Sequence, residues 1–445
     1  MDILFAHVTA VTMDPEAPLL CDAYVGVADG RIAYVGTKRP DGPAARTVDG
    51  RGHVLMPGLV NAHTHLPMTL LRGYADDYAL QAWLFEHIFP AEARMDGRAV
   101  RAGTLLAIAE AVSFGTVSVS DMYDHCGDIA ACVAEAGLKA NLSRGVLCLD
   151  EPFDRRTHAG FAETVALCDE WHGYDGGRIR VDAAIHAEYT SGPALWEAVA
   201  ALARERGLRL QVHLSETQRE HERCLAANGL TPAARLARAG VFSVPVTAAH
   251  AVWLSEEDMD LLAGHGAAVV HCPVSNCKLA SGAAPLAAWR RHGLTVALGT
   301  DGTASNNTLD LFEEIKLSAL LAKCLSGDPA APRAEETLGL AVGGGACAQG
   351  RAGETGRVAV GFDADLILLD FSRPHLTPCY DVVSQLVYAA RGGDVVLTMV
   401  RGRVLYDHGA FPTIDIERVL YELRDYALPR VAGDRQFPIS PVWMC

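Results

Sequence analysis

Short buried runs alternate with helical segments eight times between residues 57 and 354, and this alternation constrains the fold more than any other feature. The runs are Leu59–His65, Thr116–Met122, Lys139–Val146, Arg180–Glu188, Leu208–Glu216, Val246–Val252, Ala267–Pro273 and Thr295–Asp301. Amphipathic stretches such as Arg98–Phe114 and Pro193–Glu205 separate them. Repeated strand–helix alternation predicts a parallel (β/α)8 barrel, the TIM barrel, with its active site at the carboxyl ends of the strands.

The two ends of the chain differ from this middle region and are rich in short β runs with glycine turns. Asp22–Gly36 has two apolar runs around Ala28-Asp29-Gly30, which is a hairpin signal, and similar segments return at Gly356–Leu369 and Val395–Tyr406. A barrel takes about 250 residues, so a chain of 445 residues should contain a further unit. We predict a small β domain from residues 1–56 and 355–445, including a C-terminal extension, and a barrel from residues 57–354.

The composition excludes several classes of partner. With 38 Lys and Arg against 54 Asp and Glu, the net charge of -16 argues against nucleic acid, whose binding depends on basic side chains. No stretch reaches the roughly 20 apolar residues that cross a bilayer, and the N-terminus does not resemble a signal peptide. The 12 scattered cysteines are typical of reduced thiols. A cytoplasmic protein without a membrane partner is therefore expected.

Ionisable side chains lie at the ends of several otherwise apolar runs. They are His63, His65, His213, Glu216, His250 and Asp301. Residues two apart in a strand face the same side, so the imidazoles of His63 and His65 can reach one point. Such groups are costly to bury unless they are paired or bind a metal. Three imidazoles and a carboxylate suit zinc or another borderline divalent ion, and we predict His63, His65, His213 and Asp301 as its ligands.

These histidines also have other interpretations. A lone histidine on an apolar run is usually a hydrogen-bonded core residue, and only the ordered set of strand ends makes a metal site the stronger interpretation. The cytidine-deaminase-like signature is HxE followed by PCxxC. His186-Ala187-Glu188 matches its first half, but Pro378-Cys379 is followed by Tyr380-Asp381-Val382, so the second half is missing. HExxH and phosphate-loop motifs are absent. His271 is interpreted as a packing residue near the site, not a ligand.

Several longer segments closely resemble the amidohydrolase superfamily. They are MPGLVNAHTH (56–65), HLSET (213–217), AAHAVWL (248–254), HCPVSN (271–276) and LGTDGTASNN (298–307). The resemblance covers nearly the whole chain and implies a (β/α)8 barrel with a small β-sandwich formed from both ends. Members with two metals usually carry a carboxylated lysine on the fourth strand, and the fourth run here has none. A single divalent ion per subunit is therefore expected, Zn²⁺ first, with Fe²⁺ or Mn²⁺ as alternatives.

Within that superfamily the chain is most similar to 5'-methylthioadenosine/S-adenosylhomocysteine deaminases. Their pattern is matched by Leu70–Gly73, Ala75–Asp77, Trp83–Leu84, Glu92 and Arg144. The resemblance implies that Trp83 lines the adenine or 5' pocket and that Glu92 binds the ribose hydroxyls. It also implies that Arg144 and Arg156 face the 5' substituent and that His186 touches the nucleoside, although Arg155 could replace Arg156. Taken alone, Trp83 would be a core residue, Glu92 a helix-start acid and Arg144 an ion-pair residue.

The resemblance implies hydrolytic deamination of 5'-methylthioadenosine and/or S-adenosylhomocysteine to the inosine analogue and ammonia. A bound metal lowers the pKa of water to about 7. Asp301 would accept the water proton, His250 would hold the hydroxide, and Glu216 would bind the substrate and protonate a ring nitrogen. The expected partner is a small-molecule nucleoside, and a homo-oligomer is expected.

Three alternatives remain open at this point. The substrate could be another 5'-modified adenosine, such as 5'-deoxyadenosine, or adenosine itself. The same ligands could serve a free purine, pterin or triazine ring, because function depends on the pocket and not on the fold; a ribose-binding Glu92 would argue against a free base. A non-enzymatic barrel is disfavoured because all four ligands, Glu216 and His250 are present.

Overall fold

The parallel α/β architecture expected from the alternation is present in the computed structural model, which describes residues 1–149 and 152–433. Each of the eight predicted runs contains a strand. These are β6 (Leu59–Thr64), β7 (Thr116–Met122), β8 (Lys139–Ser143), β9 (Ile179–Val181) with β10 (Ala183–Ala187), β11 (Leu210–Leu214), β12 (Val246–His250), β13 (Ala268–His271) and β14 (Thr295–Leu298). They form two parallel sheets, ordered β6-β7-β8-β9 and β10-β11-β12-β13-β14. Their residues are almost all buried, as expected for strands covered on both faces.

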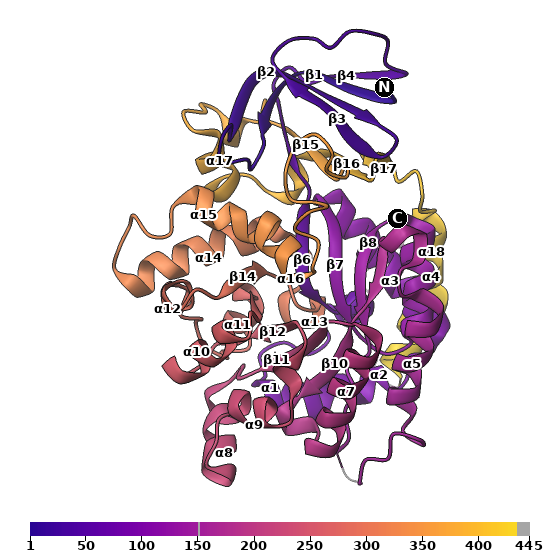
Figure 1. The fold of residues 1–445 in the computed structure, drawn as a ribbon. Coiled ribbons are helices and arrows are strands. Elements are labelled where there is room, and N and C mark those ends of the chain that lie inside the picture. Colours follow the sequence, from indigo (N-terminus) through magenta and orange to yellow (C-terminus); the bar gives the residue numbers. More distant parts are fainter. Residues whose placement is uncertain (150–151, 434–445) are drawn as a thin grey trace.

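Helices follow the strands and surround the parallel sheets (Figure 1). The longer ones are α3 (Gly97–Ser113), α4 (Cys126–Ala136), α5 (Ala159–Trp171), α7 (Pro193–Arg206), α8 (Gln218–Asn228), α9 (Pro232–Arg238), α10 (Glu256–Gly264) and α14 (Leu311–Ser326). Capping side chains determine where several of these helices begin. The side chain of Asp96 accepts a hydrogen bond from Ala99 N at the start of α3, and Ser255 and Asp258 form a capping box at the start of α10.

The fourth predicted run is not one strand, because the structure divides it at Asp182. β9 pairs with β8 and β10 pairs with β11, so the two halves belong to different sheets. The buried Asp182 carboxylate accepts hydrogen bonds from Asn141 Nδ2 at 3.1 Å and Gln211 Nε2 at 3.0 Å. A buried carboxylate needs such donors. The run is divided because the backbone changes its partner here: Asp182 N donates to Leu142 O, and Ala183 N donates to Arg209 O. Isolated parallel bridges between Thr64 and Asp301 and between Val146 and Ile185 connect the edges of the two sheets.

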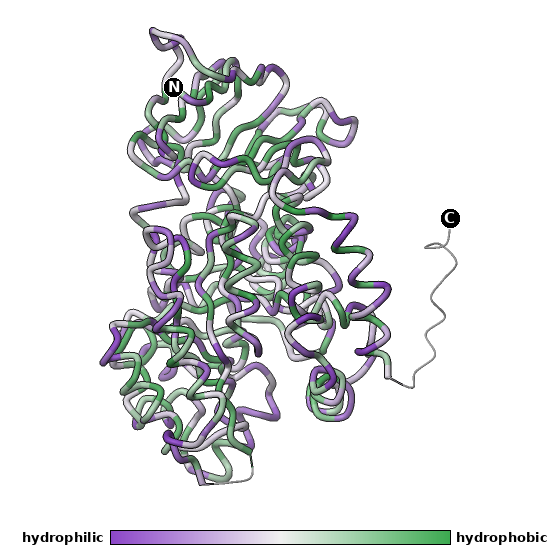
Figure 2. Tube along the Cα trace, turned by 90° about the vertical axis from the view of Figure 1, so that its right-hand side faces the viewer, coloured by the Kyte–Doolittle hydropathy of each residue, from purple (hydrophilic) through white to green (hydrophobic). Residues whose placement is uncertain are grey.

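Strands from both ends of the chain pair in a single eight-stranded sheet. They are β1 (Ile3–Val11), β2 (Leu19–Ala28), β3 (Arg31–Gly36), β4 (Arg46–Asp49), β5 (His53–Pro57), β15 (Leu366–Asp370), β16 (Val395–Val400) and β17 (Arg403–Asp407). The order is β17-β16-β15-β5-β1-β2-β3, with β4 beside β1. The antiparallel β5–β15 pair joins the two ends, and the sheet lies above the parallel strands in Figure 1. Figure 2 shows hydrophobic positions running through both parts.

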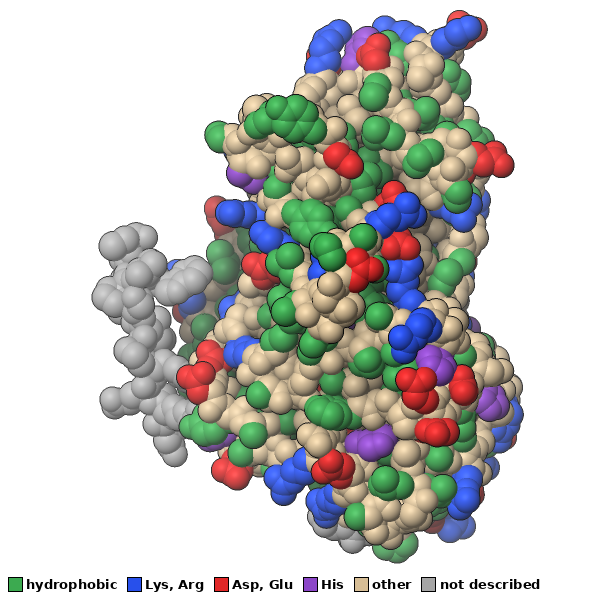
Figure 3. All heavy atoms as spheres, turned by 90° about the vertical axis from the view of Figure 1, so that its left-hand side faces the viewer, with side chains coloured by type: hydrophobic (Ala, Val, Ile, Leu, Met, Phe, Trp, Pro, Cys, Tyr) green, Lys and Arg blue, Asp and Glu red, His purple; other side chains and the backbone are tan. Residues whose placement is uncertain are grey.

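The last described helices return to the parallel region. They are α17 (Val382–Tyr388), α18 (Ile416–Glu422) and α19 (Leu428–Ala432), and α18 packs beside α3. Residues 434–445, the end of the predicted C-terminal extension, lie outside the described residues. Over the described ranges, none of the helices has the length and apolar character needed to cross a membrane. Basic and acidic side chains are interspersed on the face shown in Figure 3, so the negative charge does not form one patch there.

A buried ion cluster connects the parallel strands to the sheet built from the chain ends. Lys139, the first residue of β8, lies with its Nζ 2.7 Å from Asp363 Oδ2 and also pairs with Asp365. The side chains of Lys139, Asp363 and Asp365 are 1%, 5% and 0% exposed. Asp365 also accepts a hydrogen bond from the backbone N of Arg401, which precedes β17. The charge of Lys139 is therefore neutralised only when the C-terminal part of the chain is in place.

Replacing Lys139 with Met is expected to lower the free energy of unfolding by about 3–5 kcal/mol, because two buried carboxylates lose their shared cation. Denaturant unfolding followed by circular dichroism measures this loss. Lys316→Met, on the exposed side of α14, should change stability by less than about 0.5 kcal/mol. Equal stability of both variants would show that the cluster contributes nothing.

Candidate metal centre and adjoining cavity

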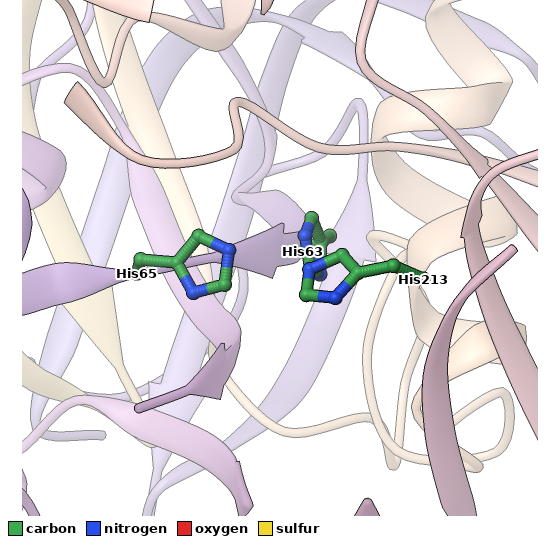
Figure 4. Close-up of side chains that lie close together, drawn as sticks. All are labelled: His63, His65 and His213. Carbon is green, nitrogen blue, oxygen red and sulfur yellow. The ribbon is translucent and has the colours of Figure 1, made fainter. Parts of the chain in front are cut away.

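Three imidazoles from two strands meet at the carboxyl ends of the parallel strands. His63 and His65 come from the end of β6 and His213 from β11, and their nearest ligand atoms lie within 4.8 Å of one another. Figure 4 shows the three rings close together, and their centroids lie 4.9 to 5.4 Å apart. The Nδ1 atoms of His65 and His213 contact the carbonyl oxygens of Met122 (2.5 Å) and His186 (2.7 Å). Those contacts turn Nε2 of both rings toward the common point.

The carboxylate of Asp301 completes this group. Its Oδ1 lies 3.1 Å from His65 Nε2 and 3.5 Å from His63 Nε2. Its Oδ2 accepts hydrogen bonds from Ser275 Oγ at 2.7 Å and Ser305 Oγ at 2.9 Å. Burial would raise the pKa of Asp301, but the imidazoles of His63 and His65 hold it well below its usual range. Asp301 is therefore a carboxylate with one oxygen anchored and the other facing the histidines.

The donor set fits a divalent metal. Burial lowers the pKa of His63 to about 4 and also lowers that of His213, so both rings are neutral, as metal ligands must be. Despite burial, the hydrogen bond to Asp301 raises the pKa of His65 to about 9, and a bound metal would displace that proton. The Nε2 atom of His63 is buried and has no hydrogen-bond partner within the described part of the chain. Buried polar atoms are rarely left unsatisfied, and a metal bound by His63, His65, His213 and Asp301 would satisfy this one.

Two further predicted residues lie beside the group. His250, at the end of β12, has a ligand atom within 4.8 Å of those of His63 and Asp301. Its Nδ1 contacts Asn276 Oδ1 at 3.0 Å, and its Nε2 lies 3.8 Å from Glu216 Oε2. Glu216 Oε1 accepts a hydrogen bond from Ser281 Oγ at 3.1 Å. Burial raises the pKa of Glu216, which favours a protonated carboxyl group in this position.

Strained backbone conformations are concentrated at these strand ends. Ser215, His250, Ala251 and Asp301 have φ angles of 45°, 68°, 50° and 61°, in the left-handed region that side-chain-bearing residues seldom adopt. Each costs on the order of 1–3 kcal/mol. The backbone N–H groups of Ser215 and Glu216 donate to Glu220, at 3.0 and 2.8 Å, which holds the turn after β11. The turns thereby aim His250, Asp301 and Glu216 toward one space.

A cavity of about 400 Å³ opens from this group. His65, His213, His250, Asp301 and Glu216 form part of its lining. The remaining wall includes four of the predicted substrate residues, which are Trp83, Glu92, Arg144 and His186. The fold therefore places nearly all of the predicted residues around one space of small-molecule size.

Trp83 and Glu92 both belong to the helical segment before α3, and both line the cavity. Trp83 is 5% exposed, and its buried Nε1 has no hydrogen-bond partner among the described residues. It thus serves both the core and the cavity, the two roles considered from the sequence. Glu92 is partly buried and hydrogen-bonded to Tyr123, and burial raises its pKa to about 7. It is not the exposed helix-start acid of the alternative interpretation.

The two predicted arginines have different surroundings. Arg144 lines the cavity and pairs with Asp124 and with Glu163, whose Oε2 lies 2.9 Å from Arg144 Nε. The side chain of Arg156 is 82% exposed, pairs with Asp154 at 2.7 Å and is not part of the cavity wall. Arg155 is likewise exposed and outside the wall. The structure therefore does not bring Arg156 or Arg155 together with the other predicted residues.

The two remaining predicted histidines are neutral; His186 is half-buried and His271 is buried. His186 contacts Thr190 Oγ1 through Nδ1 at 3.1 Å, and burial lowers its pKa to about 3. Its ring lies 4.9 Å from that of His213. His271 is 2% exposed, packs edge-on against Trp289 and does not line the cavity, which agrees with its interpretation as a packing residue.

Several functional contacts were not predicted from the sequence. They involve Asp124, Tyr123, Glu163, Glu220, Ser275, Asn276, Ser281 and Ser305. Ser275, Asn276 and Ser305 stand within the HCPVSN and LGTDGTASNN segments, so the signal for them was present. Ser281 and Asp124 lie outside those segments and carry no comparable signal.

Comparison with known proteins places this geometry in a family. Residues 54–405 match the model of the amidohydrolase family. The chain is 42% identical over 431 residues to a 5'-deoxyadenosine deaminase of Methanosarcina acetivorans, covering 97% of this chain and 99% of that protein. It is 40% identical over 430 residues to a 5-methylthioadenosine/S-adenosylhomocysteine deaminase of Pelotomaculum thermopropionicum, covering 96% and 98%.

A solved structure shows the same fold. An adenosine deaminase from Xanthomonas campestris with bound zinc is 38% identical, with a TM-score of 0.89 and coverage of 95% of this chain and 97% of that one. The similarity therefore extends over the parallel strands and the sheet built from the two ends.

Proposed function

Because this chain belongs to the amidohydrolase family, we propose that it deaminates adenosines substituted at the 5' position, including 5'-methylthioadenosine, S-adenosylhomocysteine and 5'-deoxyadenosine. The observation that carries this proposal is the single cavity, which joins the histidine–aspartate group to Glu216, Trp83 and Glu92. The names of relatives at about 40% identity support it. We further propose that the two parallel sheets form one closed barrel and that the end-derived sheet is the small β-sandwich beside it.

We propose that one divalent metal, Zn²⁺ first, is held by His63, His65, His213 and Asp301. Zinc in the Xanthomonas campestris structure supports this choice, and so does the mixed nitrogen and oxygen donor set. When bound, such an ion supplies a reactive water by lowering its pKa to about 7. Fe²⁺ and Mn²⁺ accept the same ligands.

Side chains of the protein would then accept and donate the protons of the reaction. Asp301 Oδ1, which faces the histidines, would accept a proton from the attacking water, while His250 orients that water. Glu216 would donate its carboxyl proton to a ring nitrogen of adenine, which makes the adjacent carbon electrophilic. A C–O bond forms at that carbon, and its C–N bond breaks as the leaving amine takes up the proton held by Asp301. The proton of the new hydroxyl returns to Glu216 as the ring carbonyl forms. Burial raises the pKa of Glu216, which favours the protonated form that can donate.

The rest of the cavity suits a nucleoside rather than a free base. Glu92 would accept hydrogen bonds from the ribose hydroxyls, and the indole of Trp83 would face the nucleoside. Arg144 would lie toward the 5' substituent. These assignments explain why a charged acid and a buried indole share the cavity wall with the metal-binding group.

An ammonia-release screen tests the proposed function directly. Zinc-loaded protein should release ammonia from 5'-methylthioadenosine, S-adenosylhomocysteine, 5'-deoxyadenosine and adenosine, and not from guanine, a pterin or a triazine. The inosine analogue should appear in equal amount by chromatography. Activity on free bases alone would overturn the proposal and assign the site to the other substrate class.

Ser275→Ala is expected to weaken metal binding by about 10–100-fold, because it removes a donor that fixes the Asp301 ligand. Competition with a chelator of known affinity measures the change. Ser318→Ala is the matched control, since Ser318 Oγ is also buried and has no hydrogen-bond partner in the described ranges. Equal metal affinity in the two variants would remove Ser275 from this role.

A further inference from the structure

Most of the guanidinium of Arg144 already makes hydrogen bonds or ion pairs within the protein. Its Nε donates to Glu163 Oε2 at 2.9 Å, and its Nη1 donates to the Gly145 carbonyl at 2.9 Å and pairs with Asp124 Oδ1. Only Nη2 makes no hydrogen bond with the described residues. Arginine binds carboxylates most strongly through two parallel N–H bonds, and no such pair is free here. While it makes these contacts, Arg144 therefore cannot bind a substrate carboxylate through two parallel hydrogen bonds.

The two carboxylates on Arg144 are not equivalent. Glu163 is fixed a second time, because its Oε1 accepts a hydrogen bond from the backbone N of Cys126 at 2.9 Å. The Asp124 side chain is 59% exposed and lines the cavity. Asp124 is thus the group that faces an incoming substrate and competes with it for Arg144.

The charges around this part of the cavity disfavour an anion. Among the described residues of the wall, Arg144 is the only Lys or Arg, whereas Asp124 and Glu92 both contribute carboxyl groups. The segment after Arg144 adds Leu147 and Leu149 to the same wall. An uncharged, apolar group is better suited to these surroundings than a carboxylate is.

Building on the proposed function, we propose that Asp124 directs this enzyme toward adenosines whose 5' substituent carries no carboxylate. By pairing with Arg144, Asp124 cancels the cation that the described part of the wall offers to a homocysteine carboxylate, and it adds like-charge repulsion. 5'-Methylthioadenosine and 5'-deoxyadenosine are then better substrates than S-adenosylhomocysteine. Asp124 acts here as a specificity residue, not as part of the chemical step.

The test compares kcat/KM for these three nucleosides between the zinc-loaded wild-type protein and the Asp124→Asn variant. The wild type should favour 5'-methylthioadenosine over S-adenosylhomocysteine. Asp124→Asn keeps the size of the side chain and removes its charge, and it should raise the S-adenosylhomocysteine to 5'-methylthioadenosine ratio by about tenfold, mainly through KM. A general structural disturbance would lower both values without changing their ratio.

A second substrate isolates the carboxylate. The decarboxylated thioether, adenosine with a 5'-(3-aminopropyl)thio group, has the amine of S-adenosylhomocysteine and lacks its carboxylate. It should not share the gain in Asp124→Asn. An equal gain with this amine would overturn the proposal, because the carboxylate would then not be the group excluded.

Asp169→Asn is the matched control. Asp169 is a similarly exposed carboxylate, 57% against 59% for Asp124, and it pairs with Arg206 outside the cavity wall. Its removal should leave the substrate ratio unchanged. If the wild type deaminates these nucleosides but Asp124→Asn leaves the ratio unchanged, the specificity proposal is wrong. If the wild type deaminates none of them, the proposed function itself fails.

Discussion

Glu216→Gln is expected to lower kcat by about 10²–10⁴-fold, the usual contribution of a positioned proton donor. The amide keeps the shape of the side chain and the contact with Ser281, but it has no acidic proton to give to the adenine ring. Because Glu216 is not in the predicted ligand set, metal content should remain at one equivalent. Steady-state kinetics together with elemental analysis of the same sample measures both quantities.

A substitution at a surface glutamate is the control for this result. Glu222→Gln, on the exposed face of α8, should retain wild-type kcat. If Glu216→Gln also turned over at a near-normal rate with full metal content, Glu216 would have no part in proton transfer. Loss of metal in that variant would instead place Glu216 among the groups that maintain the metal centre.

His63→Ala is expected to abolish both metal binding and activity. His63 is the histidine common to both groups of potential ligands, and its Nε2 is the buried atom without a hydrogen-bond partner. In the wild type, Zn²⁺ at 1,000 times its Kd should stabilise the folded state by about 4 kcal/mol, which appears as a rise in Tm. The variant should show neither a bound equivalent nor this rise.

A second buried histidine provides the control for His63. His271 is 2% exposed, as His63 is, but it lies outside the cavity wall and packs on Trp289. His271→Gln should retain one equivalent of metal and the zinc-dependent rise in Tm. Full metal occupancy in His63→Ala, or loss of metal in His271→Gln as well, would contradict the ligand assignment.

The metal-binding group could be predicted from the sequence because strand geometry alone determines most of it. Residues two apart on a strand share a face, which places His63 beside His65, and parallel strands present their carboxyl ends at one edge. His213, His250 and Asp301 follow from the same rule. Residue order and strand ends were enough to indicate which side chains lie together.

The contacts that depend on loop conformation could not be predicted. Ser275 and Ser305 reach Asp301 from α11 (Pro273–Lys278) and α13 (Thr303–Asn306), two helices that are too short for a periodic pattern to predict. The pairing of Asp124 with Arg144 joins a loop residue to a strand-end residue, and sequence spacing does not indicate it. The division of the fourth run follows the change of backbone partner between Asp182 and Ala183, which the hydrophobic pattern does not indicate.

The ion cluster of Lys139, Asp363 and Asp365 limits how this protein can be engineered. A fragment that stops before residue 363 would contain a buried ammonium group with no counter-charge, so trimming the chain to its parallel strands and their helices should give an insoluble or unfolded product. A circular permutant that joins the native termini and opens the chain in an exposed loop would retain all three charges. A redesigned version of this protein should therefore relocate its chain ends by permutation and should keep the terminal segments.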